Sequence, residues 1–167
     1  TDKARDWALD GDTIYFPTGE YQITNAGDEG VTFVSRKSLS LMGDGHDKSM
    51  IRRVGSTNRW AVLTNCRDTL IEGLGFNRNG HTDYGGVTFY SALGATIRHC
   101  RAFDPSPPQA PTHDLYPFVF GIGGTMSKHV LIEHCIIEDL QLEVDHADGV
   151  LIQKNKVYRS KTTASIG

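Results

Sequence analysis

Short apolar runs, separated by Gly, Asn, Asp and Pro, follow one another along the chain from residue 11 onward. Runs of this length that are rich in Val, Ile, Phe and Tyr are typical of β-strands rather than helices. The first third of the chain contains strand candidates within 11–23 and at Val31–Val34, Leu39–Met42 and Met50–Arg52. The pattern predicts an all-β protein made of many short strands and tight turns.

A repeat becomes visible in the chain after residue 60. Four segments share the form Ile-x-x-[Leu/Cys/Asn]-x-apolar and begin at Ile71, Ile97, Ile132 and Ile152, with intervals of 26, 35 and 20 residues. A degenerate earlier copy contains Leu41. Strands that stack on their neighbours must keep register while their connecting loops vary, so this pattern indicates a solenoid. The longest interval results mainly from an inserted segment, 104–117.

Each repeat divides into three strands, with a tight bend between the second and the third. The first strands are expected at Trp60–Leu63, Val87–Tyr90, Phe118–Ile122 and Leu140–Val144. The second are expected at Leu70–Glu72, Thr96–Arg98, Val130–Glu133 and Val150–Gln153. The third are expected at Leu74–Phe76, Cys100–Phe103, Cys135–Glu138 and Asn155–Tyr158. Three strands per coil predict three parallel sheets around a narrow apolar core.

Three rows of matching positions support this register. One row is expected at the bend: Leu74, Cys100, Cys135 and Asn155, with Asn155 in the left-handed backbone conformation that Asn tolerates. A second row is expected on the outer face, where neighbouring residues lie about 4.8 Å apart. Opposite charges would then be in contact along this row, which contains Glu72, Arg98, Glu133 and Gln153. The third row is the pair His99 and His134, for which we expect a structural stack rather than a metal site.

Composition and charge exclude several functional classes. The net charge of the 167-residue chain is −3, which gives no general attraction to nucleic acid or to an anionic membrane. No apolar run approaches the roughly 18 residues of a membrane-spanning helix. The three cysteines have no zinc-ligand spacing, and their odd number argues against a disulfide framework, so we expect buried thiols. No metal site and no certain cofactor are assigned.

The segments 11–23 (GDTIYFPTGEYQI), 39–45 (LSLMGDG) and 150–157 (VLIQKNKV) resemble the opening phrases and the generic coil of the pectate-lyase-like superfamily. The resemblance covers nearly the whole chain and implies a right-handed parallel β-helix. We expect one domain, 1–167, in which 1–58 forms the N-terminal cap and first coils and 59–167 forms regular coils. The last coil would end uncapped, so we expect further coils beyond the C-terminus or a partner that covers that end.

The superfamily also implies an extracellular protein, or one on a cell or virion surface, that handles polysaccharides. In its members, sugar chains bind along the first sheet and the loops between third and first strands. Mapped onto this chain, the substrate-binding candidates are His81, Asp83, Tyr84, Tyr90, Asp104, Tyr116, Glu143, Arg159 and Lys161. The catalytic candidates are His113, Asp114, Asp145 and His146.

These residue types fit two kinds of reaction. A lyase or epimerase on an acidic glycan needs a base, such as His113, His146 or a tyrosine, and a cation, such as Arg159 or Lys161, to neutralise the substrate carboxylate. A hydrolase needs two carboxyl groups at a defined separation, and pairs can be drawn from Asp83, Asp104, Asp114, Glu143 and Asp145. Calcium is a further ligand to test.

The superfamily does not fix the reaction, because it also contains tailspikes and adhesins without catalytic activity. The polygalacturonase signature is absent from the chain, and Ser106 stands where the Asp-Pro-His element of alginate epimerases has His. His113 and Asp114 also fit a loop cap, and 145–149 also fits a simple turn. A non-catalytic glycan-binding or structural module, such as a fragment of a tailspike, adhesin or surface protein, is therefore the alternative, and a homotrimer is the assembly to test for it.

Overall fold

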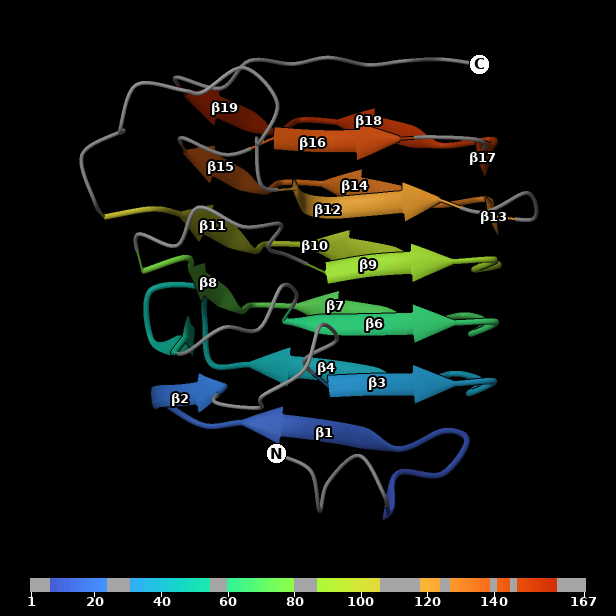
Figure 1. The fold of residues 1–167 in the computed structure, drawn as a ribbon, viewed down its shortest axis with the longest axis horizontal. Coiled ribbons are helices and arrows are strands. Elements are labelled where there is room, and N and C mark those ends of the chain that lie inside the picture. The colour runs from blue at the N-terminus through green and yellow to red at the C-terminus, as the bar shows by residue number, and fades with distance from the viewer. Residues whose placement is uncertain are drawn as a thin grey trace.

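The fold is a parallel β-helix whose coils stack in sequence order from β1 to β19 (Figure 1). This computed structural model describes residues 7–23, 31–54, 60–79, 87–105, 118–123, 127–138, 141–144 and 147–158, with the backbone alone for 118–123 and 141–144. Every strand pairing in the described part of the chain is parallel, which confirms the predicted all-β solenoid.

Three long sheets run along the solenoid. Sheet A contains β1 (Thr13–Phe16), β4 (Ser40–Gly43), β7 (Leu70–Glu72), β10 (Thr96–Arg98), β14 (Leu131–Glu133) and β18 (Leu151–Gln153). Sheet B contains β2 (Gly19–Ile23), β5 (Ser49–Arg53), β8 (Gly75–Asn77), β11 (Arg101–Phe103), β15 (Ile136–Glu138) and β19 (Lys156–Tyr158). Sheet C contains β3 (Val31–Val34), β6 (Ala61–Thr64), β9 (Val87–Tyr90), β12 (Phe118–Gly123) and β16 (Gln141–Val144).

A short fourth sheet, which the sequence did not predict, lies between sheets C and A. Sheet D pairs β13 (Ser127–Lys128) with β17 (Ala147–Asp148). Isolated parallel β-bridges continue this sheet through the earlier coils. They join Lys37 to Arg67, Arg67 to Leu93 and Leu93 to Lys128. Two-residue strands leave no periodic pattern in a sequence, which explains why this sheet was missed.

The core is built from inward rows that match the predicted register. In sheet A, Ile71 pairs with Ile97, Ile97 with Ile132, and Ile132 with Ile152. The first three are 0% exposed, whereas Ile152 in the last rung is 44% exposed. The degenerate copy is also confirmed, because Leu41 pairs with Ile71. These rows close around a continuous apolar interior, which supplies most of the driving force for folding.

The bend between sheets A and B differs from the prediction in one detail. The residues with left-handed backbone are Gly73, His99, His134 and Lys154, each one position before the expected row. Asn155 therefore does not adopt that conformation. Instead its side chain accepts a hydrogen bond from the Cys135 N–H at 2.8 Å and donates one to the Ile132 carbonyl at 2.9 Å. The prediction placed Asn155 at a positive φ, whereas its side chain in fact caps two backbone groups of the preceding coil.

Among the described residues, the structure has no helix that is long and apolar enough to cross a membrane. The three cysteines are free and buried, as predicted.

Residues 145–149 were expected to form a turn. The described part, 147–149, contains β17 followed by Gly149 at a φ of 68°, which is a left-handed turn position.

Candidate functional site

Most of the predicted site residues lie outside the part of the chain that the structure describes. These are His81, Asp83, Tyr84, His113, Asp114, Tyr116, Asp145, His146, Arg159 and Lys161. Their roles stay predictions. Tyr90 and Asp104 are described in full, and Glu143 is described through its backbone. The candidate site is therefore built from sheet C, where Tyr90 and Glu143 lie.

The outer face of sheet C has a gap in its rows of side chains. Thr88 and Tyr90 occupy alternate positions of β9 and are in register with Gly121 and Gly123 of β12. Gly121 is in turn in register with Glu143 of β16. One rung in these rows therefore carries no side chain. Because neighbouring rungs lie about 4.8 Å apart, the flanking rungs are separated by about 9.6 Å.

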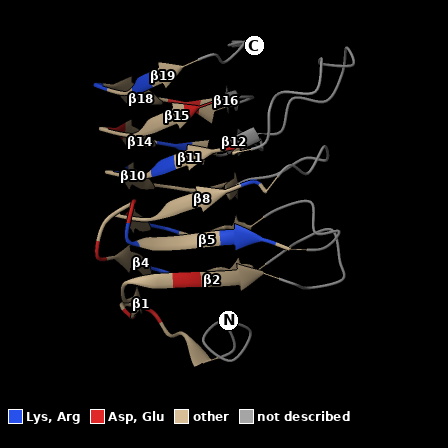
Figure 2. Cartoon of the chain, turned by 90° about the vertical axis from the view of Figure 1, so that its left-hand side faces the viewer, with Lys and Arg blue, Asp and Glu red and all other residues tan. Residues whose placement is uncertain are grey.

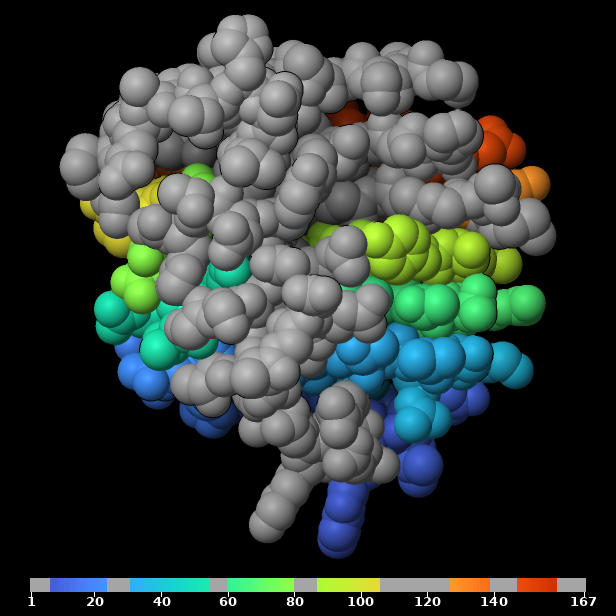
Figure 3. Space-filling model, viewed as in Figure 1, coloured from blue at the N-terminus to red at the C-terminus, as the bar shows by residue number. Residues whose placement is uncertain are grey.

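The first wall of this gap is polar and partly aromatic. Thr88 and Tyr90 are both half-buried, so neither is withdrawn into the core. Figure 3 shows β3, β6 and β9 as stacked ridges coloured blue, green and lime, in the order that the sheet pairing gives. Val62 of β6 occupies the row of Thr88 but is 1% exposed. This row is thus accessible to solvent at β9 and closed at β6.

Asp104 lies away from this gap, at the end of β11 in sheet B. Its carboxylate is 3.4 Å from the Arg78 guanidinium, and the two side chains are only 10% and 13% exposed. With so little exposure, removal of either partner would leave the other charge buried without this ion pair. The structure thus brings Asp104 together with Arg78 and places it in a different sheet from Tyr90.

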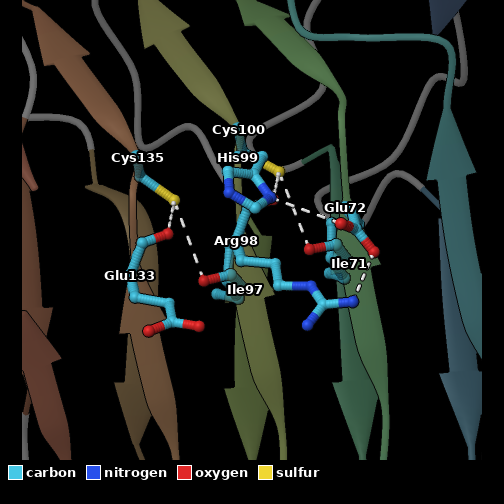
Figure 4. Close-up of polar contacts among 8 residues, drawn as sticks. All are labelled: Ile71, Glu72, Ile97, Arg98, His99, Cys100, Glu133 and Cys135. Atoms are coloured by element: carbon cyan, nitrogen blue, oxygen red, sulfur yellow. Dashed lines mark hydrogen bonds and ion pairs between the residues drawn. The ribbon is translucent and has the colours of Figure 1, made fainter. Parts of the chain in front are cut away.

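A second polar cluster lies on the outer face of sheet A (Figure 4). Arg98 donates a hydrogen bond to Glu72 at 2.9 Å, and the His99 ring nitrogen Nδ1 lies 3.3 Å from the other Glu72 oxygen. Partial burial acts to raise the pKa of Glu72, but the bonds from Arg98 and His99 outweigh it and lower that pKa. The predicted outer row is confirmed here, and Gln153 continues it by donating to Glu133 at 2.9 Å.

The two bend histidines form the stack that the sequence predicted. The rings of His99 and His134 have centroids 5.2 Å apart and planes 26° apart. Within the described ranges, no group of three or more His, Cys, Asp or Glu side chains is placed to hold a metal ion. This cluster is best explained as a support for the register of sheet A.

Sequence reasoning missed a clamp on the outer face of sheet B. Arg101 makes ion pairs with Asp47 and Glu138, both at 2.8 Å, and its guanidinium lies 4.6 Å from the centre of the Phe103 ring. Figure 2 shows this face, with acidic β2 and β15 and basic β5, β11 and β19. Asp47 is 54 positions from Arg101 in the sequence, so no local pattern could have indicated the contact.

A hydrogen-bond network in the first coils explains one residue of the 39–45 phrase, Asp44. The Asp44 carboxylate accepts bonds from the Tyr15 hydroxyl and from both the N–H and the hydroxyl of Thr18. The bond from Tyr15 contributes most to lowering the pKa of Asp44, and the same bond raises the pKa of Tyr15. With its pKa raised, the Tyr15 hydroxyl stays protonated near neutral pH and donates its hydrogen bond to Asp44, which links the first two coils.

Comparison with known proteins gives little further information about the site. No protein-family model and no curated protein sequence matches the chain. Among solved structures, the chain is similar to the Azotobacter vinelandii mannuronan C-5 epimerase AlgE4 A-module, with 13% identity and a TM-score of 0.32. The match covers 89% of this chain and 68% of that chain. We infer the fold from the strand register described above and transfer no site residue from that protein.

Proposed function

We propose that this protein binds a polysaccharide along the outer face of sheet C, outside the cell or on a cell or virion surface. The observation that carries the proposal is the rung of Gly121 and Gly123 between the rung of Thr88 and Tyr90 and the rung of Glu143. The flanking side chains are centred two rung spacings, about 9.6 Å, apart, so the rung without side chains leaves a slot about 4.8 Å wide in which a sugar ring can stand edge-on. The face of an aromatic ring packs on a sugar ring, and hydroxyl and carboxylate groups fix sugar hydroxyls.

The proposed activity is that of a lyase or epimerase on an acidic glycan. Such a reaction needs a base for the proton next to the sugar carboxylate and a cation to neutralise that carboxylate. The proposed bases are His113 and His146, and the proposed cations are Arg159 and Lys161. Support comes from the sequence, where His113 lies in the segment before β12 and His146 in the segment after β16, while Arg159 and Lys161 follow β19. Hydrolysis by a pair that includes Glu143 is the less favoured reaction.

One observation favours the alternative of a binding module without catalysis. The histidines in the described ranges are His46, His99, His129 and His134, and each lies outside sheet C. Asp104, a predicted substrate contact, is paired with Arg78. The described part of the gap thus contains groups for recognition but lacks an acid and base pair.

The two functions are separated by assaying turnover and binding on the same glycans. The full chain is incubated with pectate, alginate and neutral glycans, with and without calcium. Unsaturated products are followed by ultraviolet absorbance, and epimerised or hydrolysed products by NMR and reducing-end assays. Binding is measured on a glycan array. Turnover supports the enzyme, binding without turnover supports the module, and the absence of both contradicts the proposal.

A pair of variants tests whether the glycine gap is the site. Gly121→Gln places a side chain in the gap and is expected to weaken glycan binding or turnover at least tenfold. Thr32→Gln is the matched control, because Thr32 begins the same outer row three rungs away. The control is expected to retain binding within twofold. Equal effects of the two changes would contradict the assignment of the gap. Circular dichroism of both variants checks that the fold is retained.

A further inference from the structure

Two of the three cysteines face each other across neighbouring coils. Cys100 and Cys135 occupy the same position at the bend between sheets A and B, and the Ile136 N–H donates to the Cys100 carbonyl at 2.9 Å. Both side chains lie in the core, with 0% and 1% exposure. Leu74 fills the same position one coil earlier, so this row is part of the apolar interior.

The two sulfurs also point the same way (Figure 4). The Cys100 Sγ lies 3.3 Å from the Arg98 carbonyl and 3.7 Å from the Ile71 carbonyl. The Cys135 Sγ repeats both contacts one coil later, at 3.3 Å from the Glu133 carbonyl and 3.8 Å from the Ile97 carbonyl. Identical contacts one rung apart place the two thiols side by side.

The two neighbouring thiols affect each other's ionisation. Burial raises the pKa of Cys100 well above its usual value, and the hydrogen bond with Cys135 adds to this increase. The same hydrogen bond lowers the pKa of Cys135. Cys135 is therefore the better nucleophile of the two, because the thiolate is the form that attacks a disulfide.

We propose that, as the chain folds and before the core closes, a small-molecule disulfide oxidises Cys100 and Cys135 to a disulfide bond between neighbouring coils. The rung spacing of about 4.8 Å lies within the range of Cα separations, roughly 4.4–6.8 Å, that a disulfide spans. The Cys135 thiolate attacks the oxidant and releases one thiol, and the Cys100 thiolate then attacks the Cys135 sulfur and releases the second. The protein loses two protons and two electrons, which the oxidant takes up.

The bond would enclose the part of the chain that carries the longest insertion. Segment 104–117, with the predicted catalytic residues His113 and Asp114, lies between the two cysteines in the sequence. A covalent link at both ends of this coil would hold the base of the insertion in register. Cys66 lies in a different row, with its Sγ 3.6 Å from the Phe33 and Thr64 carbonyls.

Peptide mapping of the full chain tests the proposal without any mutation. The protein is unfolded, refolded in a buffer of reduced and oxidised glutathione, and alkylated before digestion with trypsin. Cleavage after Lys and Arg places the cysteines in separate peptides, 60–67, 99–101 and 129–154. The expected product is a disulfide between 99–101 and 129–154, with Cys66 alkylated. Three alkylated cysteines, stable glutathione adducts or a bond to Cys66 would overturn the proposal.

Two variants serve as controls for the assignment. Cys66→Ala is expected to lose the mass of two hydrogen atoms on oxidation, as the unchanged chain does. Cys135→Ala is expected to keep both remaining thiols. A disulfide in the Cys135→Ala protein would contradict the pairing. The result of the peptide map stands even if a variant does not fold.

Discussion

Truncation of two isoleucines in the same row gives a quantitative test of the stacked core. Ile97→Ala removes a side chain that is 0% exposed and enclosed between Ile71 and Ile132. The transfer of three buried carbons costs about 2.4 kcal/mol, and the cavity left behind brings the expected loss to about 3–5 kcal/mol. Ile152→Ala removes the same atoms from the last rung, where the side chain is 44% exposed. Its expected cost is about 1.3 kcal/mol, because little more than half of the transfer energy is lost and no closed cavity forms.

The assay is urea unfolding, followed by far-ultraviolet circular dichroism, with the free energy of unfolding extrapolated to water. Ile136→Ala controls for loss of strand propensity, since Ile136 is half-buried in the outer row of sheet B. We expect a cost below about 1.5 kcal/mol for this control. Equal costs for Ile97→Ala and Ile152→Ala would refute the reasoning, because the two positions would then have the same burial.

Three further changes test individual contacts. Glu72→Gln removes an ion pair of a partly exposed carboxylate and is expected to cost about 0.2–1 kcal/mol near neutral pH. The folded-state pKa of Glu72 lies below its usual value of 4.5. The stability difference between the two proteins is therefore present above pH 4.5 and is lost as the pH falls through the folded-state pKa. Urea unfolding of both proteins at a series of pH values measures it. Asn155→Ala leaves two backbone groups of the preceding coil without their partners and is expected to cost about 1–3 kcal/mol by the same assay, whereas no change would contradict the capping role. Gly75→Ala brings a Cβ into overlap with the backbone oxygen of His46, so we expect a loss of about 1–3 kcal/mol and a lower melting temperature; an unchanged melting temperature would show that the 44–48 segment does not pack there.

The sequence predicted those parts of the fold that repeat. The isoleucine positions, the charge alternation from Glu72 to Gln153 and the histidine stack all depend on a fixed position within each coil, and all were found in register. Repetition makes an error in register visible, because a shift by one residue would turn every inward side chain outward.

Features that occur once could not be predicted in this way. The clamp of Arg101 on Asp47 and Glu138 joins three coils through long side chains, and nothing in the local sequence indicates it. The assignment of Asn155 was wrong because Asn fits both a left-handed position and a backbone cap, and only the structure shows Lys154 in the former. The glycine gap at Gly121 and Gly123 was visible in the sequence but acquired meaning only through the register of β9, β12 and β16.

Contacts between isoleucine methyl groups provide the most direct test of the stacked coils. The protein is prepared with carbon-13 at the isoleucine δ1 methyl groups alone, and nuclear Overhauser effects are recorded between them. We expect cross-peaks between Ile71 and Ile97 and between Ile97 and Ile132, with a much weaker one or none between Ile71 and Ile132, two rungs apart. Assigned spectra in which neither of the first two cross-peaks is present would contradict the parallel β-helix and the sites built on it.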